Sequence, residues 1–297
     1  MIKIESLSKS FGKKSVLQNI NLNIKPGEVV ALAGPNGAGK TTLLNLLAGI
    51  SRTKKGNITI NSLLLEKYLK LNRGIGYFQQ DFFFFNHRTF ADQLNLFFDF
   101  AGYDKTKKKQ FLDRWITDMN LKPHYNEKIK NLSHGTVVKL NFLQTIIGSP
   151  EVLIFDEPFN GLDVEQTSLV RKHIRKIKSQ SGVCIISSHD LNLLDNGLCN
   201  RFIFLQNGEI MNSLSDKELQ ENYITIVCPE EQSQVLHEKL SKLQYNAKII
   251  DTGEVEVNIV VECKTQEKRK LLKQETGSLR LVEKSDTRDI YRLFITS

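Results

Sequence analysis

The chain has 297 residues, of which 40% are hydrophobic and 25% charged, so a globally disordered or collagen-like protein is excluded. The mean hydropathy is −0.28, and no apolar run reaches the roughly 18 to 20 residues that cross a bilayer. The net charge of +8 comes from residues 1–212, with 28 Lys and Arg against 18 Asp and Glu, whereas residues 213–297 carry 13 against 15. A solvated basic face is the default interpretation, and contact with nucleic acid or an anionic membrane surface is the alternative.

Strands dominate the predicted beginning of the chain. Alternating apolar residues predict a strand at Ile2–Leu7, and a second strand at Ile20–Ile24 ends at a Pro-Gly turn. The continuous apolar run Val29–Ala33 is typical of a strand buried on both faces. A glycine-rich turn and a helix over residues 42–50 follow.

The middle of the chain, about residues 86–149, is predicted to be mainly helical. Helices are expected over residues 92–100, 107–119 and 137–147. Buried strands at 152–155 and 183–186 then alternate with a helix over 165–180. This alternation predicts an α/β fold with a parallel sheet covered on both sides, into which the helical region is inserted as a subdomain.

The pattern changes after residue 212. Strands are expected at 223–228, 247–251, 255–261 and 279–282, with helices over 231–243 and 264–274 and a last amphipathic helix over 287–294. The order βαββαβ is that of a ferredoxin-like split unit. We therefore expect two domains, residues 1–212 and residues 213–297.

The cysteines and the N-terminal segment bear on the cellular compartment. Cys184, Cys199, Cys228 and Cys263 are scattered without a CxxC pair, which argues against a zinc ribbon or a disulfide framework. The residues after Met1 lack the apolar segment of a signal peptide. We expect a cytoplasmic protein.

The strongest motif fits GxxxxGK[ST] and lies between a buried strand and a helix, the context that identifies a phosphate-binding loop. Glycines let backbone N–H groups surround phosphates, and a helix N-terminus favours negative charge. Lys40 is expected to reach the β- and γ-phosphates, and the Thr41 hydroxyl is expected to ligate magnesium. The predicted nucleotide-binding residues of this loop are Gly34, Pro35, Asn36, Gly37, Ala38, Gly39, Lys40, Thr41 and Thr42.

Two carboxylates follow the buried strand at 152–155. A carboxylate leaving the C-terminal end of such a strand, near a phosphate loop, is in the position that a magnesium ligand requires. We assign that role to Asp156. The next residue, Glu157, is predicted to polarise the attacking water.

With these motifs, residues 1–212 resemble an ATP-binding-cassette (ABC) transporter ATPase subunit of the bacterial exporter type. Further segments carry the resemblance: Leu132-Ser133-His134-Gly135-Thr136 at the signature, Gly161-Leu162-Asp163 at the D-loop, Ser187-Ser188-His189-Asp190 at the switch and Ile75-Gly76-Tyr77-Phe78-Gln79-Gln80 at the Q-loop. The resemblance implies a P-loop NTPase cassette with an N-terminal antiparallel β element, an inserted helical subdomain and a small C-terminal α+β domain.

The resemblance also implies an activity and its ligands. The chain would hydrolyse ATP, with Mg2+ as cofactor, to drive transmembrane transport. Phe11 would stack on adenine, although packing in the core is the alternative for this ring. Gln80 would join Thr41 and Asp156 as a metal ligand, and it would also be a catalytic residue that senses the attacking water and the membrane partner. His189 would bind the γ-phosphate and orient Glu157.

The resemblance further implies partners. Leu132, Ser133, His134 and Gly135 would contact ATP held by a second subunit, and Asp163 belongs to the same interface. One chain carries one phosphate loop and one signature, so a homodimer, or a heterodimer with another ABC ATPase subunit, would enclose two ATP molecules. Separate permease subunits would hold the chain at the inner face of the membrane. No specific nucleic acid is expected.

The sequence departs from the family pattern at the signature. His134 and Thr136 replace a glycine and a glutamine, and Lys139 and Gln144 stand where family members usually carry arginines. Hydrolysis is still expected because both predicted acids and His189 remain. The C-terminal segment 287–294 resembles the end of exporter-type cassettes with an appended small domain. That domain would support dimer contact or regulation, and we expect it to have a structural rather than a catalytic role.

Three questions remain open from the sequence. Phe82–Phe85 follow Gln80 and would form either the floor of a dock for a transmembrane partner or part of the core of the helical subdomain. A non-transport ABC ATPase that acts on the ribosome or nucleic acid is the first alternative function. A different P-loop enzyme, such as a kinase or GTPase, is the second, although it would need neither the signature nor the D-loop.

Overall fold

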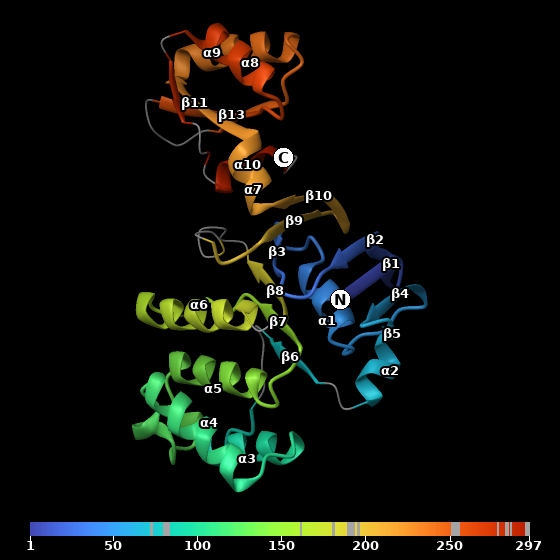
Figure 1. Cartoon of the computed structure of the whole chain (residues 1–297), viewed down its shortest axis with the longest axis vertical. Coiled ribbons are helices and arrows are strands. Elements are labelled where there is room, and N and C mark those ends of the chain that lie inside the picture. Colours follow the sequence, from blue (N-terminus) through green and yellow to red (C-terminus); the bar gives the residue numbers. More distant parts are fainter. Residues whose placement is uncertain are drawn as a thin grey trace.

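The described part of the chain is organised around three β-sheets (Figure 1). The computed structural model describes residues 1–71, 74–79, 84–160, 162–179, 182–188, 194, 197–250, 256–277, 279–282, 285 and 287–294. Among these residues, no helix combines the length and the apolar character needed to cross a membrane.

The central sheet has the strand order β10-β9-β3-β8-β7-β6. Five neighbouring strands are parallel: β3 (Val29–Ala33), β6 (Ile75–Phe78), β7 (Val152–Asp156), β8 (Val183–Ser188) and β9 (Arg201–Gln206). The edge strand β10 (Glu209–Ser215) is antiparallel to β9. Every residue of β3, β7 and β8 is buried, which explains their continuous apolar runs.

The pleat of this sheet divides its side chains between two cores. Ala31, Phe155 and Ile186 face the core shared with the helical subdomain. Leu32 and Ile154 face the opposite core, which contains α1 (Lys40–Leu47) and the N-terminal sheet. Because successive strand residues point to opposite faces, one short run supplies both cores.

The N-terminal sheet is antiparallel and has the order β2-β1-β4-β5. It consists of β1 (Ile2–Phe11), β2 (Lys14–Ile24), β4 (Lys55–Ile60) and β5 (Leu63–Leu64), followed by α2 (Leu65–Lys70). The pair β1 and β2 is longer than predicted. The prediction missed residues 14–19 because they are mostly exposed and lack a strong apolar alternation.

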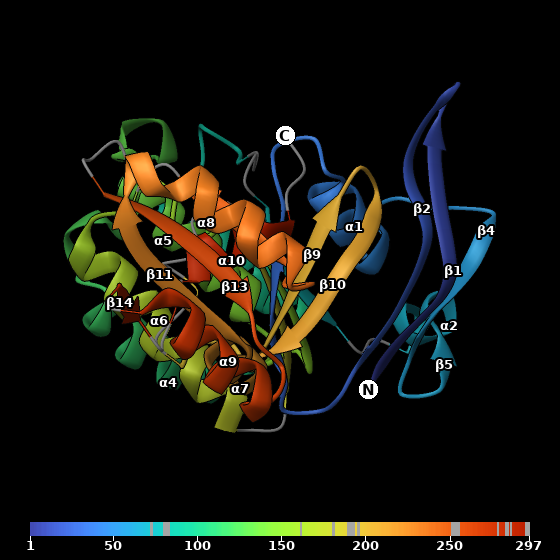
Figure 2. The ribbon, with the colours of Figure 1, turned by 90° about the horizontal axis from the view of Figure 1, so that it is seen from above.

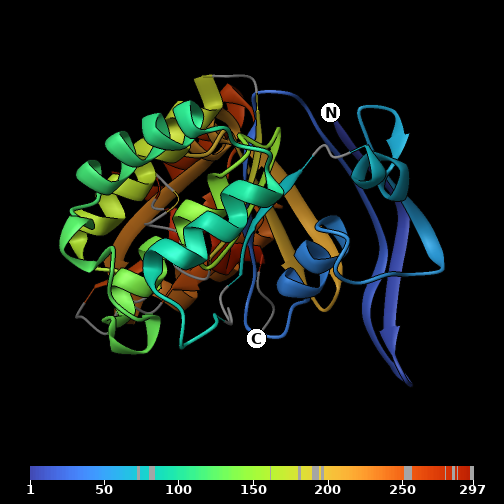
Figure 3. The same ribbon diagram turned by 90° about the horizontal axis from the view of Figure 1, so that it is seen from below.

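The helical subdomain contains α3 (Phe90–Phe100), α4 (Lys105–Asp118), short 3₁₀ turns at Lys122–His124 and Ile129–Asn131, and α5 (His134–Ile146). Side-chain caps at Thr89, Asp104 and Ser133 start its three α-helices. Figure 3 shows these helices beside α6 (Val164–Ser179), which follows β7 in the chain.

The C-terminal elements are α7 (Asp216–Asn222), β11 (Tyr223–Pro229), α8 (Glu230–Lys242), β12 (Ala247–Ile250), β13 (Glu256–Glu262), α9 (Gln266–Thr276), β14 (Arg280–Val282) and α10 (Thr287–Phe294). Their sheet is antiparallel with the order β12-β13-β11-β14. The order βαββαβ is therefore present in β11 to β14. The expected domain limit between residues 212 and 213 falls inside β10.

The two faces of the C-terminal sheet have different neighbours. Helices α8 and α9 cover one face, where they form a separate apolar core with the sheet (Figure 2). On the other face, α10 packs against β12 and β13. The ring of Phe294 lies 5.0 Å from that of Phe204 in β9 and 6.0 Å from that of Tyr223 in β11. The last helix therefore joins this sheet to the central one.

Candidate functional site

A cavity of about 780 Å³ lies where β3 and β7 end. Most of the predicted nucleotide-binding residues line it, together with the two predicted acids. They are Phe11, Pro35, Asn36, Gly37, Gly39, Lys40, Thr41, Thr42, Asp156 and Glu157. The structure thus brings the loop after β3 and the carboxylates after β7 into one site, as parallel strands require.

Five further residues line this cavity that the sequence did not indicate: Lys14, Ser15, Val16, Gln18 and Asn207. They come from the start of β2 and from the turn between β9 and β10. Gln18 is joined to that turn by its N–H, which donates to the Gly208 carbonyl at 2.8 Å. No local motif marks these residues, because only the tertiary fold brings them to the phosphate loop.

Lys40 is held inside the cavity by the loop that precedes it. Its Nζ donates to the carbonyl of Gly34 at 2.7 Å and to that of Pro35 at 3.3 Å, and lies 3.9 Å from Glu157 Oε1. Burial lowers the pKa of Lys40, and the carboxylates of Glu157 and Asp156 oppose that shift. The ammonium is therefore positioned between the loop and the acids, where an anionic ligand would gain a charged donor.

Two glycines of the loop allow close approach of the backbone. A Cβ at Gly34 would lie 2.4 Å from the carbonyl oxygen of Leu205. Gly39 has φ +106°, and a Cβ there would also lie 2.8 Å from Leu17 Cδ2. Gly39 is the N-cap of α1 and supplies no side-chain cap, so the first N–H groups of this helix keep their capacity to bind an anion.

Asp156 and Glu157 are oriented through Ser187 of β8. Ser187 Oγ donates to Asp156 Oδ1 at 2.5 Å and accepts from the N–H of Glu157 at 3.0 Å. Asp156 pairs directly with Ser187 in the register of β7 and β8. Glu157 has φ +49°, a left-handed conformation that is uncommon outside glycine and that clusters at functional sites.

Oxygen ligands for a magnesium ion are present in the same cavity. The Asp156 carboxylate and the Thr41 hydroxyl both line it. Mg2+ prefers oxygen donors and is usually bound by one or two protein groups together with substrate phosphates. The donor set therefore fits this ion.

Phe11 lies at the end of β1 and lines the cavity with 56% of its surface exposed. Lys9 Nζ lies 4.9 Å from the centre of its ring. This exposure argues against the alternative that the ring packs in the core. The free face is suitable for stacking on a nucleotide base.

Other predicted residues lie outside the described part of the chain: Gln80, Phe82, Phe83, Gly161 and His189. Two phenylalanines of the same run are described. Phe84 is half-buried against the core of the helical subdomain, and Phe85 is exposed with Arg88 over its ring. Phe84 therefore fits the interpretation as part of the core, whereas the exposed Phe85 fits the interpretation as part of a dock for a partner.

The signature residues Leu132, Ser133, His134 and Gly135 do not line the nucleotide cavity. Ser133 Oγ caps α5 by accepting from the N–H of Thr136 at 3.2 Å, and Ser133 and His134 are exposed. A Cβ at Gly135 would lie 3.1 Å from Gln166 Oε1 of α6. The structure therefore does not bring the signature and the phosphate loop of this chain together.

Asp163 is exposed and caps α6, where its Oδ1 accepts from the N–H of Gln166 at 2.8 Å. It does not line the nucleotide cavity either. The D-loop residue and the signature therefore each begin a helix on the outside of the chain.

The unusual residues of α5 have local partners. Lys139 Nζ donates to the Met119 carbonyl at 3.1 Å. Gln144 Nε2 donates to Asn141 Oδ1 at 2.9 Å, and Asn141 Nδ2 donates to the Gln79 carbonyl at 3.0 Å. These bonds tie the helix to the end of α4 and to the end of β6.

Comparisons with known proteins identify the family of the chain. The ABC transporter family matches residues 17–160. MJ1023 of Methanocaldococcus jannaschii, an uncharacterized ABC transporter ATP-binding protein, is 35% identical over 211 residues, which cover 71% of this chain and 76% of that protein. YdbJ of Bacillus subtilis, also an uncharacterized ABC transporter ATP-binding protein, is 29% identical over 279 residues and covers 93% of this chain and 88% of its own length.

One further relative is named for a direction of transport, and one solved structure shares the fold. FbpC of Fusobacterium nucleatum, named an Fe(3+) ion import ATP-binding protein, is 28% identical over 219 residues, covering 73% of this chain and 59% of that protein. A dimeric cassette structure, MJ0796 in a post-hydrolysis state bound to ADP and Pi, has a TM-score of 0.65 at 24% identity, covering 72% of this chain and 98% of that one. The last similarity shows a shared fold.

Proposed function

The chain belongs to the ABC transporter family of ATP-binding proteins and is an ATPase, and we propose that it works as a nucleotide-driven dimer that moves separate transmembrane subunits. One observation carries this proposal: the cavity that joins Phe11, Lys40, Asp156 and Glu157. These side chains supply a base-stacking surface, a phosphate-binding cation, a metal ligand and an acid beside one another.

The hydrolytic step is proposed to use this chain's residues as follows. Lys40 and the first N–H groups of α1 bind the β- and γ-phosphates of ATP. Thr41 and Asp156, with Gln80, would hold Mg2+, which would supply positive charge beside the phosphates. Glu157 accepts a hydrogen bond from the attacking water and polarises it. Ser187 acts as a positioning residue, because it fixes both acids, and His189 completes the contact with the γ-phosphate.

The dimer is proposed from residues that are exposed in one chain. Ser133 and His134 are exposed at the start of α5, and Asp163 is exposed at the start of α6. Val164 next to Asp163 has 89% of its surface exposed, which is unusual for an apolar side chain of this size. We propose that Leu132, Ser133, His134 and Gly135 bind the γ-phosphate of ATP held by a second subunit, either an identical chain or a related one.

Transport is the proposed purpose of the cycle, with export as its direction. The C-terminal unit, which we place after β10, and the pattern of α10 are the features that favour an exporter. The chain would lie at the inner face of the membrane through its permease partner.

Inverted vesicles that carry the complete complex test the direction of transport. Their cytoplasmic face is outside, so ATP-driven uptake of substrate into them would show export, whereas ATP-driven efflux from them would contradict export.

Affinity capture from detergent-solubilised membranes tests the proposed partner. The Glu157→Gln variant, loaded with ATP, is expected to retain transmembrane subunits that are identified by mass spectrometry. Glu209→Gln, an exposed acid on the edge strand β10, is the matched control that hydrolyses ATP and releases them. Recovery of ribosomes or RNA without any membrane protein would contradict transport and would favour the non-transport alternative, for which the basic start of α4 is the supporting feature.

A further inference from the structure

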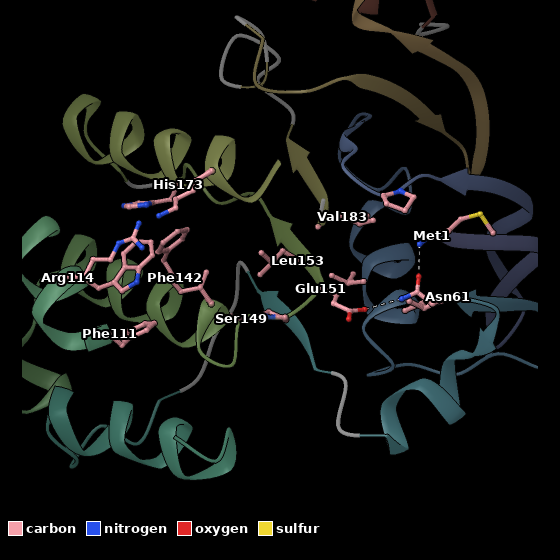
Figure 4. Close-up of a pocket in the computed structure, with 18 residues that line it drawn as sticks. Met1, Asn61, Phe111, Arg114, Phe142, Ser149, Glu151, Leu153, His173 and Val183 are labelled. Carbon is pink, nitrogen blue, oxygen red and sulfur yellow. Dashed lines mark hydrogen bonds between the residues drawn. The ribbon is translucent and has the colours of Figure 1, made fainter. Parts of the chain in front are cut away.

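A second cavity, of about 520 Å³, lies at the opposite end of β7 and β8 from the nucleotide cavity. Figure 4 shows Leu153, Val183 and Ser149 in its middle, between residues of the helices and residues of the N-terminal sheet. Four residue steps along β7 separate Val152, which lines this cavity, from Asp156, so the two sites are roughly 13 Å apart along the strand. It is therefore a separate site.

Aromatic rings form one end of this cavity. Phe111 and Trp115 of α4, Phe142 of α5 and His173 of α6 all line it. The ring of His173 lies 3.9 Å from that of Trp115 and 5.9 Å from that of Phe142. Three helices thus contribute flat side chains that suit an apolar or aromatic ligand body.

His173 brings a polar atom to this aromatic end. The side chain is only 6% exposed, and its Nε2 has no hydrogen-bond partner among the described residues. Buried polar groups in proteins are nearly always hydrogen-bonded, so such an atom at a cavity wall indicates a missing ligand or water. Burial, and to a smaller extent Arg114, lowers the pKa of His173 to about 4, so the neutral ring keeps one N–H to donate near pH 7.

The charges around the aromatic end are mainly positive. Arg114 and Lys176 both line the cavity. The guanidinium of Arg114 lies over the Trp115 ring, 5.1 Å from its centre. Asp118 also acts on His173 but does not line the cavity. Among the described lining residues, the one carboxylate is that of Glu151, which lies at the other end (Figure 4) and accepts a hydrogen bond from Asn61 Nδ2 at 3.0 Å.

We propose that this second cavity binds a small organic anion with an apolar body. The body packs against Phe111, Trp115 and Phe142, and the anionic group accepts hydrogen bonds from Arg114 and from His173 Nε2. The volume lies within the range of about 300–1,000 Å³ that is typical of small-molecule sites. The charge pattern selects anions over neutral ligands of the same shape.

Fluorescence of Trp115, the one tryptophan of the chain, reports directly on this cavity. The probes are 4-phenylbutyrate and 4-(4-biphenylyl)butyrate, with their uncharged amides for comparison. We expect both carboxylates to give saturable changes in the full-length protein, and each amide to bind about tenfold more weakly than its acid. A change that grows linearly with concentration, or equal affinity for acids and amides, would overturn the proposal.

Two variants and a control test the residues. Arg114→Gln, at an exposed position, is expected to weaken carboxylate binding about tenfold, and His173→Phe, which keeps an aromatic ring, about fivefold. Lys109→Gln removes a cation from the exposed face of the same helix without touching the cavity and is expected to change nothing. Unchanged carboxylate binding in Arg114→Gln would show that the anion is not bound there.

Discussion

Glu157 and Ser187 show how single residues of this chain are fitted to the site. Glu157 adopts φ +49°, a conformation that disfavours most side chains, and its N–H bonds Ser187 Oγ. The same hydroxyl donates to Asp156. One serine in β8 therefore fixes the carboxylate that suits a metal ion and the backbone of the acid that is proposed to polarise water.

Phe11 provides a test of adenine binding. Replacement by alanine removes the exposed ring and is expected to weaken ATP binding by about 1–3 kcal/mol, with the turnover number at saturating ATP unchanged. Isothermal titration with ATP in the Glu157→Gln background measures the affinity. Phe11→Trp is the control that keeps a stacking face, and equal ATP affinity in the alanine variant and the parent would exclude stacking.

The motif residues were predictable one by one, but their mutual contacts were not. The loop 34–42 and the pair Asp156-Glu157 belong to local sequence patterns. In each pattern a buried strand comes first, and a loop or helix follows it. The bond from Ser187 depends on the register of β7 against β8, which the sequence does not encode locally. The same holds for Lys14 and Asn207, which distant turns bring to the cavity.

Ser133 has one observed role and one proposed role, and substitutions separate them. It caps α5 in the single chain, and it is proposed to contact ATP of the partner. Alanine is expected to destabilise the chain by about 1 kcal/mol through loss of the cap, whereas aspartate keeps the cap. Both should prevent ATP-driven dimerisation of the Glu157→Gln variant, aspartate through repulsion of the phosphate.

Thermal unfolding and light scattering of these two variants measure the two roles. A dimer formed by Ser133→Asp in the Glu157→Gln background would contradict the role in phosphate contact. A stability of Ser133→Asp as low as that of the alanine variant would contradict the capping role.

His173 lies at the contact of α6 with α4 and makes that contact sensitive to pH. Its pKa of about 4 in the folded chain is below the ordinary value of 6.5, so the unfolded chain takes up the proton first as the pH falls. The stability that comes from the neutral ring is present above pH 6.5 and is lost between pH 6.5 and 4. From pH 7.5 to 5 this loss is about 2 kcal/mol.

Urea unfolding followed by Trp115 fluorescence measures this effect. His173→Phe is expected to lose about 2 kcal/mol less than the parent over the same pH interval, because phenylalanine cannot take up a proton. Other charged groups near the ring (Arg114, Asp118, Lys172 and Lys176) are unchanged in this comparison. An identical pH dependence in the variant and the parent would show that His173 titrates normally.

Elements with strong periodicity were predicted within two or three residues, and weaker ones were missed. Helices α3, α4, α5 and α6 and strands β3, β7 and β8 lie where apolar spacing places them. Strand β9 was missed because the apolar run Phe202–Leu205 is short and fits either a helix or a strand. Strand β4 was missed because its first half, Lys55–Asn57, is exposed, which leaves only Ile58 and Ile60 to alternate.

Helix α10 is one of the elements that join the C-terminal unit to the central sheet, and Leu219 of α7 lies in the same core. Phe294 lies between Phe204 of the central sheet and Tyr223 of the C-terminal sheet. Phe294→Ala is expected to destabilise this junction by about 2 kcal/mol, less than for a fully buried ring because Phe294 is half-buried.

Amide hydrogen exchange measures the effect of this substitution. Exchange should rise in β11 and α10 but not in the phosphate loop. Val235→Ala, at a site with 71% of its surface exposed, is the control that should leave exchange unchanged. Protection that is unaltered in Phe294→Ala would show that the ring does not hold the two sheets together.

The proposed mechanism depends on two chains closing around ATP. Each chain has its phosphate loop in one cavity and its signature outside that cavity, so the site that we propose is completed by a second copy or a related subunit. The mass of the Glu157→Gln variant in solution, measured by light scattering with and without ATP, tests this most directly. We expect 33.9 kDa without nucleotide and twice that mass with ATP for a homodimer. A single-chain mass at saturating ATP, together with normal ATP turnover by the isolated wild-type monomer, would contradict the mechanism.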